Sequence, residues 1–111
     1  AAFYQMVLNG GTYNGKRLLS RAVVEMMTTL HTGDIWKSVG YGLAWTIVRD
    51  EGGTLQMQSI GTYGHGGAFG TLGWVDPKKD LVGVLMIQSA GGDGPDASNA
   101  LRQLAAASIT E

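Results

Sequence analysis

The segment YGHGGAFGTLGWVDPKKDLVGVLMI, residues 63–87, contains the signals that decide the fold. Two runs typical of β-strands, Thr71–Val75 and Leu81–Ile87, flank a turn in which Pro77 suits the second position. Five glycines and one histidine lie within residues 63–74. Glycine in a strand indicates a bulge, a bend, or the close approach of a ligand or another backbone. The segment therefore predicts a β-hairpin whose first strand has a glycine-rich entry.

The residues before this segment predict a second hairpin. Side chains alternate from Tyr41 to Val48 at the two-residue period of a strand. Residues 50–53, Asp-Glu-Gly-Gly, are typical of a turn, and the alternation from Leu55 to Gln58 predicts the returning strand.

Three helices are expected around these strands. The first residues carry apolar side chains at helical spacing and predict a short helix that ends at Asn9-Gly10-Gly11. Asn14-Gly15 then predicts a tight turn. Ser20 suits the N-cap of a second helix over about Arg21 to Thr29. A closing helix starts near Pro95. Its apolar face comprises Ala97, Ala100, Leu101, Leu104, Ala105 and Ser108.

The order of these elements is helix, helix, four strands, helix. It predicts an α+β fold, in which an antiparallel sheet of about four strands is flanked by N-terminal and C-terminal helices that cover at least one of its faces. A length of 111 residues suits a single segment with one modest core.

Composition excludes several classes of partner. Eight Lys and Arg residues face nine Asp and Glu residues, so the net charge of −1 offers no field to gather nucleic acid or anionic lipid. The longest apolar runs are far shorter than the ~20 residues that a membrane span needs. The chain has no cysteine, and His31 and His65 are far apart with no His-x-x-x-His pair. We therefore expect no metal site, no other cofactor and no membrane span.

The chain contains no recognisable nucleophile. None of its six serines is followed by a lysine three residues later, and no Gly-x-Ser-x-Gly motif occurs. GHGGAFG is not a dinucleotide fingerprint, because Phe69 stands at the third glycine and a strand follows where a helix is required. On local pattern, His65 is either a structural histidine or an acid, base or hydrogen-bond donor. Gly66 and Gly67 are equally open between a structural bulge and a site.

Four stretches, taken in order, carry a resemblance to a known family: residues 3–29, residues 41–47, residues 64–88 and the final helix. Together they resemble the C-terminal part of the β-lactamase-like serine hydrolases. That superfamily includes class C β-lactamases, D-alanyl-D-alanine carboxypeptidases, D-amino-acid amidases and β-lactamase-type esterases. The most specific feature is His65-Gly66-Gly67 followed by a strand and the WVDP hairpin, since these enzymes carry a Lys/His-Thr/Ser/Gly-Gly box on the strand that lines the active site.

The resemblance implies a role for each residue of this box. His65 is similar to its basic residue, Gly66 stands where Thr or Ser is common, and Gly67 is the box glycine. Ala68 follows the box, where family members use a backbone N–H as one of two oxyanion-hole donors. Small residues at positions 66 and 67 would let an acyl group lie against the strand edge.

The resemblance also implies that the chain is part of a serine hydrolase that works through an acyl-enzyme on an ester, an amide or a β-lactam. The family's Ser-x-x-Lys and Tyr-x-Asn motifs do not occur here, so we expect them in an N-terminal part of a longer protein and expect residues 1–111 alone to be inactive. Gly66 lacks the hydroxyl that commonly holds a substrate carboxylate. This favours an ester or amide without a carboxylate over a β-lactam or D-Ala-D-Ala substrate.

The expected partner is thus a small-molecule or peptidic acyl substrate. Self-association, or pairing with the N-terminal part, is expected where sheet edges or core faces lie open. A periplasmic or secreted location is implied by the resemblance alone. The alternative is a non-catalytic binding domain on the same scaffold, whose glycine-rich strand edge accepts a peptide or a second chain by strand addition.

Overall fold

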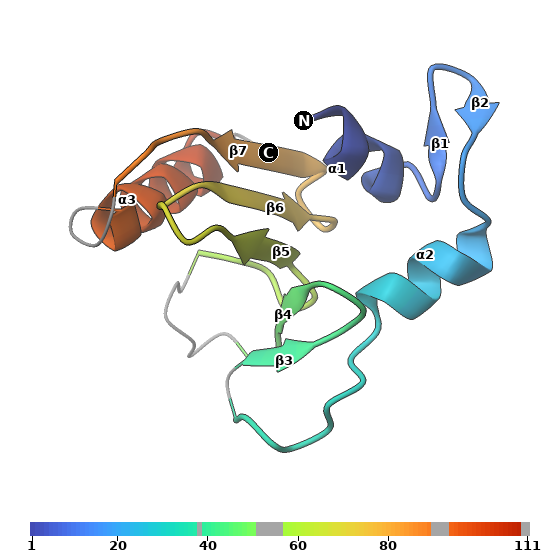
Figure 1. Ribbon diagram of the computed structural model, residues 1–111, viewed down its shortest axis with the longest axis horizontal. Coiled ribbons are helices and arrows are strands. Elements are labelled where there is room, and N and C mark those ends of the chain that lie inside the picture. The colour runs from blue at the N-terminus through green and yellow to red at the C-terminus, as the bar shows by residue number, and fades with distance from the viewer. Residues whose placement is uncertain (38, 51–56, 90–93, 110–111) are drawn as a thin grey trace.

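An antiparallel sheet with strand order β3-β4-β5-β6-β7 forms the centre of the computed structural model, which describes residues 1–37, 39–50, 57–89 and 94–109 (Figure 1). The strands are β3 (Val39–Tyr41), β4 (Thr46–Val48), β5 (Tyr63–Gly66), β6 (Leu72–Asp76) and β7 (Leu81–Leu85). A separate small sheet pairs β1 (Thr12–Tyr13) with β2 (Lys16–Arg17).

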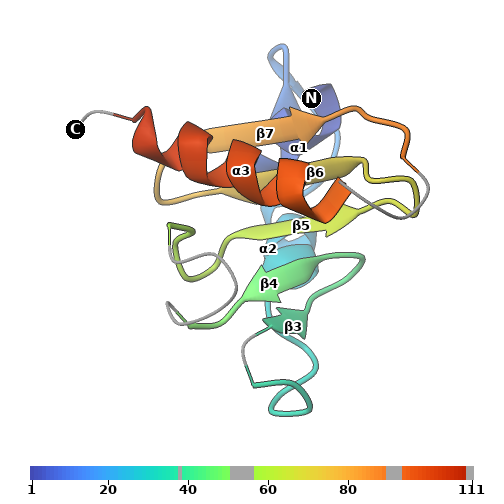
Figure 2. The same ribbon diagram turned by 90° about the vertical axis from the view of Figure 1, so that its left-hand side faces the viewer.

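Helices cover both faces of the large sheet. Figure 2 shows α3 (Gly94–Ala107) crossing one face, while α1 (Ala2–Leu8) and α2 (Arg21–Thr28) lie behind the other. We refer to the two sides as the α3 face and the α1 face. The expected α+β class, with helices flanking an antiparallel sheet, is confirmed.

The core lies on the α1 face. Tyr63 of β5 pairs with Ile47 on one side and with Val75 on the other, and all three side chains are buried. Val7 of α1 and Trp45 pack into the same cluster. Because side chains alternate along a strand, Trp74 points instead to the α3 face, where the Arg102 guanidinium lies 5.9 Å from its ring centroid.

Two glycines let aromatic rings lie directly on the sheet. A Cβ on Gly73 would fall 2.2 Å from the ring of Tyr4 on the α1 face. A Cβ on Gly83 would fall 2.0 Å from the ring of Trp74. Any larger residue at either position would displace the ring that covers it.

The predicted helix ends and turn are confirmed. Helix α1 ends where Gly10 and Gly11 adopt φ angles of 64° and 95°. Ser20 caps α2 by accepting a hydrogen bond from the Val23 N–H at 3.2 Å. Asn14 and Gly15 both have positive φ, which is the type I′ geometry that joins two antiparallel strands.

The prediction of a single strand from Tyr41 to Val48 is wrong. The Gly42 N–H donates to the Trp45 carbonyl at 3.0 Å, and Ala44 has φ 67°, so a turn divides the run into β3 and β4. Strand β5 was not among the expected strands either, so the large sheet has five strands among the described residues, one more than the roughly four expected. The expected returning strand falls partly on residues 55–56, outside the described residues, and Met57 and Gln58 lie in a turn and bend rather than in a strand.

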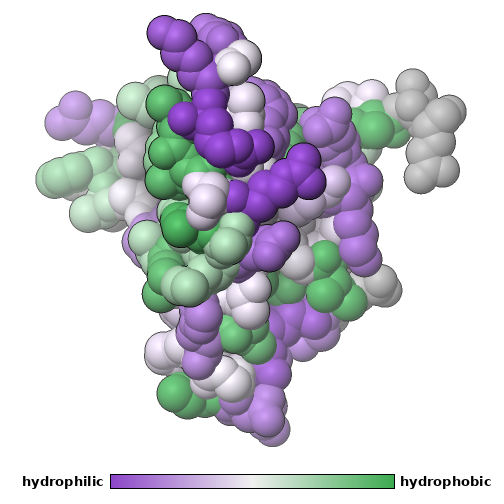
Figure 3. All heavy atoms as spheres, turned by 90° about the vertical axis from the view of Figure 1, so that its right-hand side faces the viewer, coloured by the Kyte–Doolittle hydropathy of each residue, from purple (hydrophilic) through white to green (hydrophobic). Residues whose placement is uncertain are grey.

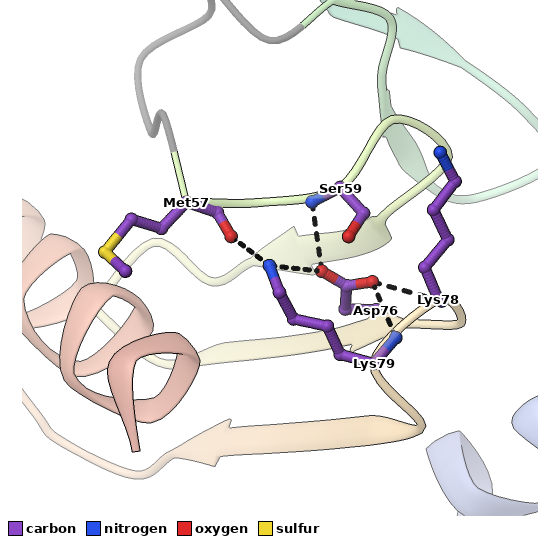
Figure 4. Close-up of polar contacts among 5 residues, drawn as sticks. All are labelled: Met57, Ser59, Asp76, Lys78 and Lys79. Atoms are coloured by element: carbon purple, nitrogen blue, oxygen red, sulfur yellow. Dashed lines mark hydrogen bonds and ion pairs between the residues drawn. The ribbon is translucent and has the colours of Figure 1, made fainter. Parts of the chain in front are cut away.

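A buried carboxylate joins the β6–β7 turn to the chain that enters β5 (Figure 4). Asp76 is 2% exposed and accepts hydrogen bonds from the N–H groups of Ser59 at 3.0 Å, Lys78 at 3.2 Å and Lys79 at 3.3 Å. The Lys79 ammonium contacts both this carboxylate, at 3.4 Å, and the Met57 carbonyl. Burial raises the pKa of Asp76, but the bonds from Ser59 and the charge of Lys79 outweigh it, so the pKa lies below its ordinary value.

No helix in the described part of the chain is long and apolar enough to cross a membrane.

Candidate active site

A hollow of about 340 Å³ opens on the α1 face, beside the end of β5. It is lined by residues from α1, β5, the β5–β6 connection, β6 and β7 with the residue that follows it: Tyr4, His65, Gly66, Gly67, Thr71, Leu72, Gly73, Val84 and Met86. Three of the four residues predicted for the site, His65, Gly66 and Gly67, thus share one cavity.

The register of the sheet explains why these residues meet. His65 pairs with Gly73, and Gly73 pairs with Val84, so the three occupy one row across β5, β6 and β7. A Cβ on Gly73 would lie 2.3 Å from the Tyr4 hydroxyl. The phenol of α1 therefore lies over the residue that is paired with His65. Burial raises the pKa of Tyr4, so the hydroxyl stays neutral and can donate or accept a hydrogen bond at neutral pH.

The edge of β5 is open where His65 and Gly66 lie. Strand β4 pairs with Tyr63 and Gly64, whereas the ladder to β6 runs on through His65 and Gly66. In the described residues, no strand flanks His65 and Gly66 on the β4 side. An extended group from outside could lie against this edge.

His65 is exposed, and its ring is fixed by its own backbone. Nδ1 lies 2.6 Å from the Gly66 carbonyl oxygen. This contact leaves Nε2 as the ring nitrogen that can meet an outside partner.

The two box glycines have different surroundings. The Gly67 N–H donates to the Thr71 carbonyl at 2.8 Å, and a Cβ on Gly67 would lie 2.2 Å from the Thr71 hydroxyl. The Thr71 hydroxyl therefore occupies the space that a side chain at Gly67 would take. A Cβ on Gly66 would meet only the Thr71 carbonyl oxygen, at 3.7 Å, so packing does not require glycine there.

Ala68 lies in the turn between β5 and β6 and is exposed. The Gly70 N–H closes this turn on the Gly67 carbonyl at 3.1 Å. Within the described ranges, the Ala68 N–H makes no backbone hydrogen bond, so it is available to a ligand. Ala68 does not line the hollow itself; it follows directly on Gly67, which does.

Sequence reasoning missed Tyr4 and Thr71. Nothing local to α1 indicates that Tyr4 reaches a strand about 70 residues away in sequence. Thr71 could have been found, because a hairpin that pairs His65 with Gly73 places it opposite Gly67.

A metal is not indicated by the side chains that the structure describes, since no three His, Asp or Glu residues gather closely enough to hold one.

Comparisons with known proteins agree on one family. The model of the Beta-lactamase family matches residues 1–108. A relative from Escherichia coli O157:H7, named "Putative D-alanyl-D-alanine carboxypeptidase", is 32% identical over 92 residues, which is 78% of this chain and 20% of that protein.

Two solved structures share the fold. A penicillin-binding protein homologue from Caulobacter crescentus matches with a TM-score of 0.69 and 19% identity over 95% of this chain and 29% of that one. EstCE1, a hydrolase with promiscuous acyltransferase activity, matches with a TM-score of 0.67 and 20% identity over 93% of this chain and 27% of that one. The chain spans between 20% and 28% of the length of the curated relatives that it matches.

Proposed function

The chain belongs to the beta-lactamase family, and we propose that residues 65–68 form one wall of the acyl-transfer site of a serine hydrolase. The observation that carries this proposal is the hollow beside the open edge of β5, which His65, Gly66 and Gly67 line. An acyl group laid against this edge would have the Ala68 N–H at its end. The reaction would pass through an acyl-enzyme, with a nucleophile supplied by a segment other than residues 1–111.

The role assigned to Ala68 is electrostatic. When a nucleophile attacks an acyl carbon, the carbonyl oxygen becomes an oxyanion, and a fixed N–H about 3 Å away stabilises it. The free Ala68 N–H meets the first requirement for such a donor, because no backbone group in the described residues competes for it. Loss of one donor of this kind typically costs about 3 kcal/mol in the transition state.

The substrate proposed is an ester or an amide without a carboxylate beside the reacting bond. Gly66 offers no hydroxyl to such a carboxylate, and the polar side chains that line the hollow are the imidazole of His65 and the hydroxyls of Tyr4 and Thr71. A β-lactam or a D-alanyl peptide would leave its carboxylate without the partner that the family commonly supplies.

Replacing Ala68 by proline tests the proposed donor. The experiment uses a polypeptide in which a segment with a Ser-x-x-Lys motif precedes residues 1–111, because the proposed nucleophile lies outside these residues. Ala68→Pro removes the N–H, although its ring also fixes φ at this position and restricts Gly67, and it should lower kcat for a chromogenic ester by about 10²–10³-fold. Ala68→Gly keeps the N–H and is the matched control. Equal kcat for the proline and glycine variants would rule out Ala68 as the donor.

The open edge of β5 also suits a binding module that accepts a peptide by strand addition. The coding sequence upstream distinguishes the two functions. A Ser-x-x-Lys motif there supports the hydrolase, and a sequence without one supports the binding module.

A further inference from the structure

The chain has two histidines, and each ring is held by a backbone carbonyl through a different nitrogen. His65 contacts the Gly66 oxygen through Nδ1 at 2.6 Å. His31 contacts the Met26 oxygen through Nε2 at 2.6 Å. Both histidines are exposed, and each of these carbonyls is the hydrogen-bond partner of its imidazole ring.

A carbonyl oxygen can accept a hydrogen bond but cannot donate one. The ring nitrogen that faces it must therefore carry the proton. In a neutral imidazole one nitrogen is a donor and the other an acceptor, so the contact made by one nitrogen decides the chemistry of the other. For the neutral rings, the two contacts thus select opposite tautomers, with the proton on Nδ1 in His65 and on Nε2 in His31.

We propose that the Gly66 carbonyl keeps a proton on Nδ1 of His65, so that the neutral form of this ring offers Nε2 to the substrate as a hydrogen-bond acceptor. This inference rests on the proposed function for its substrate, and on the two ring contacts for its tautomer. A lysine at this position of the box would present only donors and a fixed positive charge. A neutral acceptor takes the opposite kind of group, namely an N–H or O–H of the substrate.

This assignment narrows the substrate class. The group beside His65 is a hydrogen-bond donor, such as the N–H of an amide or the hydroxyl of an alcohol portion, and not a carboxylate. Gly66 is consistent with this assignment, because glycine supplies no hydroxyl that would help to hold an anion.

Nitrogen NMR of the 111-residue chain tests the tautomer directly. Long-range ¹H–¹⁵N correlation spectra are recorded at a pH of about 9, well above the ~6.5 at which an imidazole ordinarily titrates. A His65→Gln variant identifies which signals belong to His65, and His31 serves as the internal control. We expect a protonated Nδ1 in His65 and a protonated Nε2 in His31. A proton on Nε2 of His65, or equal populations of the two tautomers, would overturn the proposal.

Substitution of His65 tests the role of Nε2 in the longer polypeptide. Glutamine places an acceptor oxygen near the position of Nε2, whereas lysine supplies a cation and no acceptor. We expect His65→Gln to retain at least tenfold more kcat/KM for a neutral amide or ester than His65→Lys. Rescue by lysine to the level of glutamine or above would contradict an acceptor role. An unsubstituted polypeptide with no hydrolytic activity would count against the proposed function, while the spectra alone would still decide the tautomer.

Discussion

At the scale of single residues, the site depends on what each glycine makes room for. Gly73 admits the Tyr4 ring, and Gly67 admits the Thr71 hydroxyl. Gly66 has space around it and lies beside the open edge of β5. Packing therefore requires glycine at positions 67 and 73, whereas Gly66 leaves space for a ligand.

Alanine at Gly73 and at Gly66 should have different effects on stability. The new Cβ at Gly73 would lie 2.2 Å from the Tyr4 ring, so the ring must move, and overpacking of this kind typically costs about 1–3 kcal/mol. The new Cβ at Gly66 would meet its nearest atom at 3.7 Å, and we expect a change below about 0.5 kcal/mol. Urea unfolding of both variants measures the difference. Equal destabilisation by the two substitutions would show that Tyr4 does not rest on Gly73.

Asp76 should make stability depend on pH. Its pKa in the folded chain lies below the unfolded value, so the carboxylate stabilises the fold above that value. This contribution is lost as the pH falls below about 4 and through the folded pKa. At neutral pH, Asp76→Asn should reduce the free energy of unfolding by about 1–3 kcal/mol, because N–H donors and the Lys79 ammonium lose a charged acceptor.

Urea unfolding from pH 3 to pH 8 measures the Asp76 contribution. Asp80→Asn is the matched control, since Asp80 lies exposed in the same turn and its φ of 49° suits asparagine. The gap between the Asp76 variant and the unmodified chain should narrow toward pH 3. A gap that stays constant over this range would exclude an electrostatic contribution from Asp76.

At the scale of elements, the sequence predicted those parts whose signals are local. Helices α1 and α2 and the Asn14-Gly15 turn follow from capping and turn residues, and the β6–β7 hairpin follows from two apolar runs around Pro77. The run from Tyr41 to Val48 was misjudged because its turn depends on tertiary contacts. The Leu43 N–H donates to the Met27 carbonyl of α2 at 3.0 Å, which no alternation pattern records.

The candidate site divides in the same way. His65, Gly66, Gly67 and Ala68 came from a motif, and the structure places them on or directly after β5. Tyr4 reaches the site because α1 packs on the sheet, and only the three-dimensional structure reveals this packing.

Replacing Ala44 by glycine should stabilise the β3–β4 turn. A non-glycine residue at φ 67° costs roughly 1–2 kcal/mol, and glycine removes that cost at the expense of backbone entropy. We expect a net gain of about 0.5–1 kcal/mol in the free energy of unfolding. Ala22→Gly, on the exposed surface of the first turn of α2, is the control and should instead lose stability, by less than the ~1 kcal/mol that glycine costs in a helix interior. A lower thermal midpoint for the Ala44 variant would contradict the turn geometry.

At the scale of the whole molecule, the α1 face leaves large apolar side chains exposed. Met86 lines the hollow and is 79% exposed, and Phe3 of α1 is 52% exposed. Figure 3 shows apolar side chains among polar ones on the side of the molecule that carries α1 and α2. Such surface on a chain that spans less than a third of its relatives' length favours association with a second segment or a second copy.

The isolated chain should therefore self-associate through the α1 face. Light scattering over a concentration series should give a mass above that of one 11.7 kDa chain. Met86→Lys should shift this equilibrium toward monomer, whereas Leu104→Lys, at a position on α3 that is 69% exposed, should not. A clean monomer at high concentration would contradict the prediction.

The position of the acyl group decides whether the nucleophile lies outside residues 1–111. The 111-residue chain, and a polypeptide that carries a Ser-x-x-Lys segment ahead of it, are each incubated with a chromogenic ester and analysed by mass spectrometry. We predict one acyl adduct on the serine of the Ser-x-x-Lys motif and an unmodified mass for the 111-residue chain. A stoichiometric adduct on any of the chain's own six serines would contradict it.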